Sequence, residues 1–178
     1  VWQERAAARA AAINERCWDE EAGLFLDYDS RSSKRRDYPF ATVFWTMWAG
    51  FATREQAARI VALLPDFEAD GGLRTSLHTT GCQWDNPFGW APLNYLAVMG
   101  LRRYGYRHEA RRLARRFVSL VTSEFRRTGQ LFEKYDVENM TSDVQGKIQF
   151  GYPTNETGFG WTNACMMEML DYLGCLGD

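Results

Sequence analysis

The chain has 178 residues, a formal net charge of −2 and a hydrophobic content of 46%. This length is enough for one domain with a sizeable core, and the composition is that of an ordinary globular protein. The nearly balanced charge gives no electrostatic signature of a nucleic-acid-binding protein, and no apolar run reaches the ~18 residues that a membrane-spanning helix needs. Four scattered cysteines without a CxxC pair, and only two histidines, argue against a structural zinc site.

Apolar residues recur at helical spacing in six segments. These segments are residues 2–17, 39–51, 53–64, 92–104, 107–127 and a last one that opens after residue 158 and extends to Leu176. The second segment is apolar nearly all round, which predicts a helix buried on both sides. Thr53 and Gln56 form a capping box at the start of the third segment, and Pro65 is expected to end it. No βαβ alternation is present, so the pattern predicts an all-α fold of helical hairpins, a barrel or toroid, around long loops.

The first long loop, residues 66–92, contains the segment QWDNPFGWAP at positions 83–92. Its two prolines cannot lie inside a helix, and Gly89 permits backbone angles that are closed to other residues. Indole rings beside a carboxylate and a carboxamide suit a sugar, whose C–H groups lie on the ring while its hydroxyls bond to oxygen atoms. The alternative is a Trp-rich turn that fills the core, and composition alone favours neither.

The second candidate segment, residues 131–138, has an extended pattern and carries Glu133 and Asp136. Glycoside hydrolysis needs one carboxylic acid that protonates the leaving oxygen and one carboxylate that acts as base or nucleophile. Aromatic neighbours such as Phe132 and Trp161 would desolvate Glu133 and shift its proton affinity toward neutral pH. Lys134 follows Glu133 on the extended segment, so its side chain is expected to face the other way.

These segments resemble the signatures of trehalases, glycoside hydrolase family 37. Residues 83–92 are similar to the family pattern QWDxPxGWAP, residues 71–76 (GGLRTS) to its GGLxT segment, and residues 132–137 (FEKYDV) to its EKYDV. Residues 158–163 (GFGWTN) match a further family signature, and residues 18–29 also have the look of the family. The motifs occur in family order over essentially the whole chain.

The resemblance implies an (α/α)6 toroid that hydrolyses α,α-trehalose, or a related α-glucoside, to glucose with inversion and without metal or cofactor. By the same resemblance, Glu133 is the general base that activates a water molecule. The glucose pocket would be lined by six further side chains, namely Gln83, Trp84, Asp85, Trp90, Phe159 and Trp161. The sequence implies a disaccharide or glucoside as its ligand and points to no nucleic acid and no membrane as a partner.

The chain departs from the family pattern in two places. Nothing before residue 71 matches the family's acid motif, so no catalytic acid is assigned. The family's GGEY or AEYG segment corresponds to residues 149–153 (QFGYP), which carry no Glu at the matching position, while Glu156 is displaced. The second departure leaves open another (α/α)6 glucosidase, for example one for glucosylglycerate, and a non-catalytic carbohydrate-binding remnant is the rival reading.

The number of helices sets a further expectation about domain organisation. Six hairpins need twelve helices, or roughly 190 residues before any catalytic loop is added. Residues 1–178 are therefore expected to form the C-terminal portion of a single catalytic domain whose upstream half is not present in this chain. Such a portion should expose a large apolar edge and be inactive alone. The sequence gives no indication of the compartment.

Overall fold

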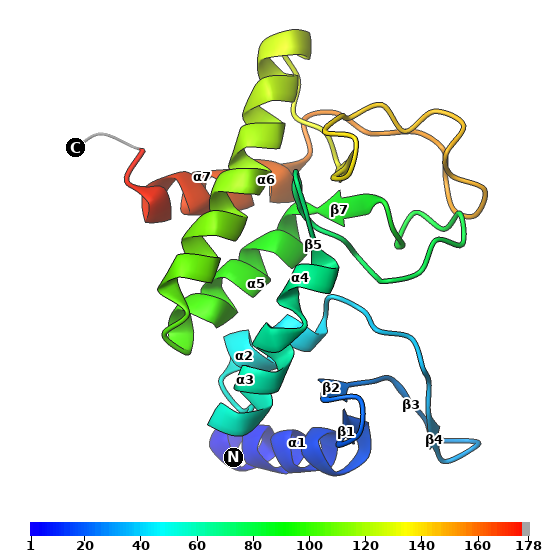
Figure 1. The fold of residues 1–178 in the computed structure, drawn as a ribbon, viewed down its shortest axis with the longest axis vertical. Helices are drawn as coiled ribbons and strands as arrows, with labels where there is room; N and C mark the ends of the chain where they lie inside the picture. The colour runs from blue at the N-terminus through cyan, green and yellow to red at the C-terminus, as the bar shows by residue number, and fades with distance from the viewer. Residues whose placement is uncertain (176–178) are drawn as a thin grey trace.

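The computed structural model describes residues 1–175, and helices dominate it (Figure 1). Residues 176–178, which include the expected core residue Leu176, lie outside the described part. The helices are α1 (Trp2–Cys17), α2 (Val43–Ala49), α3 (Arg54–Ala62), α4 (Leu64–Phe67), α5 (Ala91–Arg103), α6 (Arg107–Thr128) and α7 (Gly160–Leu173). Within the described residues, no helix is both long and apolar enough for a membrane span.

In the described part of the chain, the strands are short and pair into four antiparallel ribbons. They are β1 (Trp18–Asp19) with β2 (Leu24–Phe25), β3 (Tyr28–Asp29) with β4 (Lys34–Arg35), β5 (Glu68–Ala69) with β6 (Gly72–Leu73), and β7 (Phe88–Trp90) with β8 (Lys134–Asp136). A helical scaffold with long loops and short β ribbons was the fold class predicted from the sequence, and the structure confirms it.

Helix α5 is the centre of the core, where it contacts α2, α6 and α7. Its buried side chains include Leu93, Val98 and Leu101. Gly100 lets α2 come very close, because a Cβ atom there would lie 2.9 Å from the carbonyl oxygen of Phe44 and 2.9 Å from the amide nitrogen of Trp48. The hairpin of α5 and α6, with α7 packed against both helices, carries the long loops (Figure 1).

Helix α2 differs from its prediction in length and in burial. It begins at Val43 instead of residue 39, because Phe40 forms a β-bridge with Ser76. Trp45 and Trp48 are 39% and 47% exposed, so the expectation of burial on both sides is wrong for the described chain. The three-residue spacing places both indoles on one helix face, which no described element covers fully.

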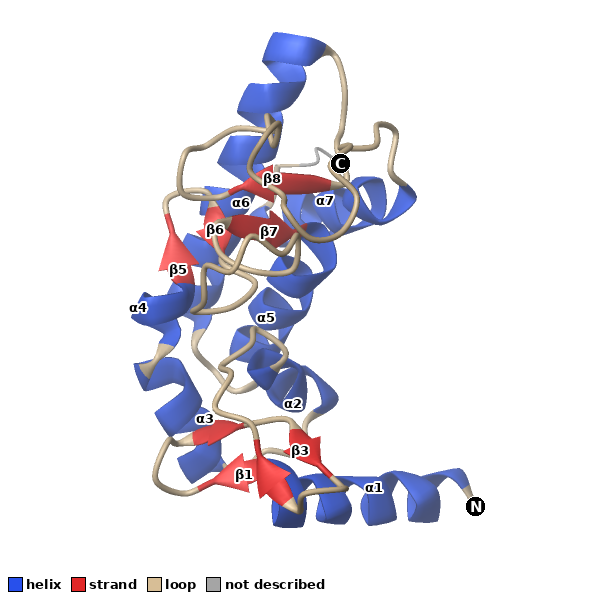
Figure 2. Ribbon diagram, turned by 90° about the vertical axis from the view of Figure 1, so that its right-hand side faces the viewer, coloured by secondary structure: helices blue, strands red, loops and turns tan. Residues whose placement is uncertain are grey.

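Helix α1 also presents apolar side chains without a full cover. It spans the predicted residues but has no buried residue, and Trp2 is 79% exposed. Its amino-terminal part projects away from the remainder of the chain (Figure 2). The helical spacing of apolar residues in the last segment predicts a core position for Met167, but in α7 this residue is 55% exposed. Helix α3 ends at Ala62, three residues before Pro65, and Pro65 itself lies in the first turn of α4.

The ribbon of β7 and β8 joins two motifs that are more than forty residues apart in the sequence (Figure 2). Its register pairs Phe88 with Asp136, Gly89 with Tyr135 and Trp90 with Lys134. A Cβ atom on Gly89 would lie 2.4 Å from Val137 and 2.7 Å from the carbonyl oxygen of Leu73. Glycine is thus required here by the close approach of neighbouring segments, and not by the unusual backbone angles that the sequence suggested.

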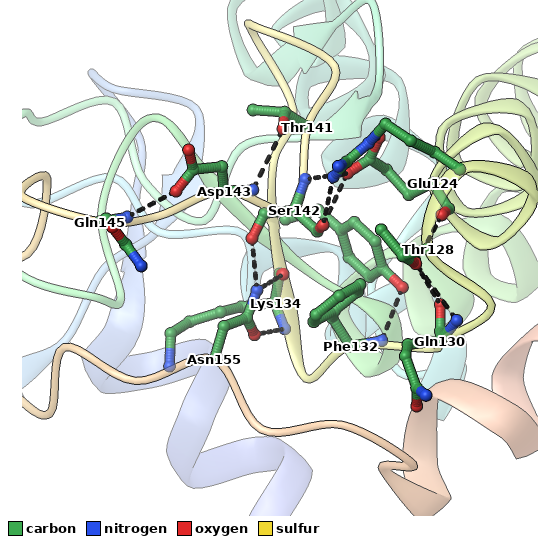
Figure 3. Close-up of polar contacts among 12 residues, drawn as sticks. Glu124, Thr128, Gln130, Phe132, Lys134, Thr141, Ser142, Asp143, Gln145 and Asn155 are labelled. Carbon is green, nitrogen blue, oxygen red and sulfur yellow. Dashed lines mark hydrogen bonds and ion pairs between the residues drawn. The ribbon is translucent and has the colours of Figure 1, made fainter.

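The loop of residues 139–157 is fixed to helix α6 and to β8 by buried polar groups (Figure 3). Glu124 accepts hydrogen bonds from the amide and hydroxyl of Ser142, at 2.7 and 2.6 Å, and from Arg127 at 2.6 Å. The Asn155 carboxamide donates to the carbonyl oxygens of Lys134 and Ser142, at 2.9 and 2.8 Å. These contacts hold both ends of the loop beside β8.

The Glu124 contacts predict a pH-dependent contribution to stability. The guanidinium of Arg127 and the donors of Ser142 outweigh burial and lower the pKa of Glu124 from 4.5 to about 2. Because the folded-state pKa lies below the unfolded one, this stabilisation is present above the unfolded pKa and is lost as the pH falls toward about 2. Glu124→Gln should therefore lower the free energy of unfolding at pH 7 by roughly 2–3 kcal/mol, since solvent at the half-exposed Arg127 screens part of the pair. Urea denaturation from neutral to acidic pH should show the difference from wild type shrinking, whereas a constant difference would contradict this account.

Candidate active site

The site forms where the two motif-bearing loops and the start of α7 meet. Residues 83–90 lead into α5, and Glu133 immediately precedes β8. The indole N–H of Trp161, in the first turn of α7, donates to the carbonyl oxygen of Glu133 at 3.4 Å. The two long loops also bond to each other, because the amide of Gln83 donates to the carbonyl oxygen of Phe150 at 3.2 Å. Three of the sequence motifs therefore converge on Glu133.

Four of the predicted binding residues form one aromatic cluster beside Glu133. Trp84 and Trp90 stack with their ring centroids 3.7 Å apart, and Trp161 meets both rings edge-on. Phe159 packs against Trp161 at 4.7 Å. Trp84 is 39% exposed while Trp90 is only 1% exposed, so Trp84 presents the open indole surface and Trp90 supports it from beneath.

Glu133 is almost completely buried, with 2% of its surface exposed. One carboxylate oxygen, Oε2, accepts a hydrogen bond from the Lys134 ammonium at 2.9 Å. The other oxygen, Oε1, accepts a hydrogen bond from the hydroxyl of Tyr152. Both oxygens of the predicted base are therefore held by named donors, one of them charged.

The position of Lys134 corrects the expectation that it faces away from Glu133. The β ladder begins at the pair of Trp90 and Lys134, so Glu133 lies before the strand. Its amide bonds to the carbonyl oxygen of Glu156 at 2.9 Å, and strand alternation does not apply across this junction. The four-carbon side chain of lysine then brings its ammonium back to the neighbouring carboxylate.

The side chain of Asp85 is buried within the loop that carries it. It is 1% exposed, and its carboxylate accepts hydrogen bonds from the hydroxyls of Tyr38, Thr80 and Ser76. Burial opposes ionisation, but these three hydroxyls outweigh it and hold the pKa of Asp85 below its usual value. The structure thus gives Asp85 a part in shaping the loop, while its contact with a sugar stays a prediction.

Tyr152 is the site residue that sequence reasoning missed. It lies in the 139–157 loop, where no periodicity indicates which way a side chain points, and its hydroxyl closes over Glu133. Burial and the nearby Glu133 carboxylate raise the pKa of Tyr152 to about 12, so the hydroxyl remains a proton donor at neutral pH. Next to it, Gly151 lies against Gln83, where a Cβ atom would come within 2.8 Å of the Gln83 carboxamide carbon. The only sequence signal for this segment was its departure from the family pattern.

Helical hairpins that hold a carboxylate beside stacked indoles, on long loops, agree with the partial (α/α)6 toroid of a glycosidase that the sequence predicts. The family model described as "Trehalase" matches residues 1–174 of the chain. The chain belongs to the trehalase family.

Similar proteins place the chain within that family. It is 38% identical to a cytosolic neutral trehalase of Saccharomyces cerevisiae, an alignment that covers 97% of this chain and 25% of the relative. A cytosolic neutral trehalase of Neurospora crassa is also 38% identical, with 92% of this chain and 24% of the relative covered. The chain thus spans about a quarter of the length of these curated relatives.

Solved structures give the same fold. A neutral trehalase from Saccharomyces cerevisiae superposes with a TM-score of 0.78 at 39% identity, covering 96% of this chain and 30% of that one. A GH63 mannosylglycerate hydrolase from Thermus thermophilus superposes with a TM-score of 0.69 at 18% identity, covering 92% of this chain and 38% of that one. The second likeness shows the shared helical fold alone.

Proposed function

We propose that this chain supplies part of the active site of an inverting glycoside hydrolase that cleaves α,α-trehalose, with Glu133 as general base. The observation that carries the proposal is the buried Glu133 carboxylate, held by Lys134 and Tyr152 beside three tryptophan rings. An inverting glycosidase needs an ionised carboxylate that takes a proton from the attacking water. Membership of the trehalase family supports trehalose as the sugar.

The aromatic cluster supplies the sugar-binding part of the proposed site. The half-exposed ring of Trp84 offers an apolar surface for the C–H groups of a glucose unit. Gln83, at the same loop, carries donors and an acceptor for sugar hydroxyls. During turnover, the attacking water would take the place at Oε1 that the Tyr152 hydroxyl holds, so the 149–153 segment would have to shift.

The exposed apolar surfaces support a place for this chain within a larger toroid. One face of α2 exposes Trp45 and Trp48, and α1 exposes Trp2. An apolar groove of about 390 Å³ runs between them, lined by Ala6, Ala7, Arg9, Ala10, Ile13, Ala49 and Phe51. Because the relatives are about four times as long as the matched segment, we propose that further helices cover these faces and supply the catalytic acid.

A second candidate substrate follows from the segment that contains Gly151 and Tyr152. The family resemblance places a substrate-contacting glutamate there, and this chain has Gly151 packed against Gln83 instead. That difference favours an altered contact with the group linked to glucose, such as the glycerate of a glucosylglycerate. The third reading, a carbohydrate-binding protein without catalysis, follows from the lack of an assigned catalytic acid, since nothing before residue 71 matches the family's acid motif.

A substrate panel on the full-length protein separates the three readings. Glucose release would be measured with α,α-trehalose, glucosylglycerate, maltose and sucrose as substrates. The proposal expects α,α-trehalose to give the highest kcat/KM. A higher kcat/KM for glucosylglycerate would contradict trehalose as the substrate and favour a glucosylglycerate hydrolase. Trehalose binding in calorimetry without any glucose release would favour a carbohydrate-binding protein without catalysis.

A further inference from the structure

Lys134 occupies the most enclosed position in the site. Its side chain is 0% exposed, and its ammonium donates to three acceptors. These are Oε2 of Glu133 at 2.9 Å, the carbonyl oxygen of Thr154 at 2.8 Å and Oε1 of Gln83 at 3.3 Å. An ammonium has three N–H donors, so every donor finds a partner.

Two aromatic rings complete the enclosure. The ammonium lies 4.1 Å from the ring centroid of Tyr152 and 5.3 Å from that of Trp90, distances at which a ring face stabilises a cation. Among residues 1–175, Glu133 provides the one carboxylate within ion-pair distance of Lys134. The positive charge is therefore shut off from solvent and balanced by the proposed base alone.

A charged pair at this depth contributes little to the net stability of a fold. Removing two charges from water carries a large desolvation penalty, and apolar side chains of similar volume often stabilise a protein as well or better. A methionine at position 134 could fill the same space without that cost. A buried ion pair that directly includes the proposed base instead indicates a role in the chemistry.

We propose that Lys134 is a positioning residue that keeps the Glu133 carboxylate ionised and fixes the direction of its oxygens. This inference rests on the proposed function of Glu133 as base. A carboxyl group in a buried site without an opposite charge tends to hold its proton, and a protonated acid cannot accept another from water. Lys134 supplies the opposite charge, and its bond to Oε2 leaves Oε1 for the reacting water once the Tyr152 hydroxyl, which donates to Oε1 in this structure, has moved away.

The remaining titratable groups around Glu133 cannot take over this role. Tyr152, on the 139–157 loop, stays neutral near pH 7 because its pKa is raised to about 12. Glu156 on the same loop meets Glu133 through a backbone hydrogen bond and has no positive charge with which to replace Lys134. The neighbouring side chain from α7 is the neutral indole of Trp161.

The pH dependence of kcat/KM in the full-length protein tests this role. Lys134→Met removes the charge and its donors, Lys134→Gln removes the charge but keeps an N–H donor, and Lys134→Arg keeps the charge. Since the acidic limb of kcat/KM reports ionisation of the base in the free enzyme, it should move upward by about 1–3 pH units in the Met and Gln variants. The Arg variant should return the limb toward its wild-type position.

The outcomes separate this inference from the proposed function. A loss of kcat/KM by the same factor at every pH in both uncharged variants would overturn the role of Lys134 while leaving Glu133 as base. Retained activity in Glu133→Gln would instead overturn the base itself. If neither uncharged variant folds, Glu133→Gln/Lys134→Met decides: recovery of folding in the double variant supports the charge pairing, and failure to fold overturns it.

Discussion

Replacing Glu133 with glutamine should lower kcat for hydrolysis in the full-length protein by about 10²–10⁴-fold. Glutamine has nearly the same shape but cannot take a proton from water, so the proposed reaction would lose its base while the aromatic cluster would remain. KM should change far less than kcat, because the aromatic cluster of Trp84, Trp90 and Trp161 does not involve the Glu133 carboxylate. Steady-state kinetics with trehalose at a fixed pH measures both quantities.

Glu138→Gln is the matched control for this change. Glu138 lies five residues further along the chain, and its carboxylate pairs with Arg74 at 2.9 Å, away from the aromatic cluster. It should keep near wild-type kcat. Circular dichroism should confirm that Glu133→Gln is folded, because a loss of kcat caused by unfolding would not test the role of Glu133 as general base. A folded Glu133→Gln protein with full activity would refute the assignment.

The second large effect concerns stability. Glu133→Gln and Lys134→Met should each destabilise the fold by about 3–5 kcal/mol, because each leaves a buried charge without its partner. The double variant should be more stable than either single variant, since it buries no charge. Urea denaturation of the four proteins gives the coupling free energy directly as a double-mutant cycle.

The partly exposed pair of Arg74 and Glu138 is the internal comparison for that cycle. Its side chains are 23% and 38% exposed, so solvent screens their interaction. Removing them should change stability by at most about 1 kcal/mol, with little coupling. Additive effects at the buried pair, similar to those at this control, would mean that Lys134 and Glu133 do not depend on each other.

Helices could be read from the sequence because their signals are local. The capping box of Thr53 and Gln56 is present, and helices α1, α5 and α6 lie within a residue or so of their predicted bounds. The pairing of β7 with β8 could not be read, because three-residue strands carry almost no periodicity and their partners are distant in the sequence. The exposure of Trp45 and Trp48 was not predicted from the sequence. An apolar pattern shows that a helix face is hydrophobic, but it does not show whether another element of this chain covers that face.

The candidate site shows the same difference between local motifs, which the sequence reveals, and contacts between distant segments, which it does not. Glu133 and the tryptophans could be proposed because their motifs are distinctive. The structure brings Gln83, Trp84, Trp90, Phe159 and Trp161 together beside Glu133, while their roles stay predictions. The partners of the carboxylate were not found. Lys134 was assigned to the wrong side because strand alternation was extended one residue too far, and Tyr152 depends on a loop anchored elsewhere by Glu124 and Asn155.

The anomeric form of the glucose first released from α,α-trehalose tests the central claim most directly. Both glucose units of this sugar are α-linked, so attack by a Glu133-activated water inverts one unit and leaves the other unchanged. Proton NMR of the full-length protein's reaction at early times should therefore show α- and β-glucose in equal amounts. Initial formation of α-glucose alone would reveal a retaining mechanism and contradict the assignment of Glu133 as the base of an inverting hydrolase.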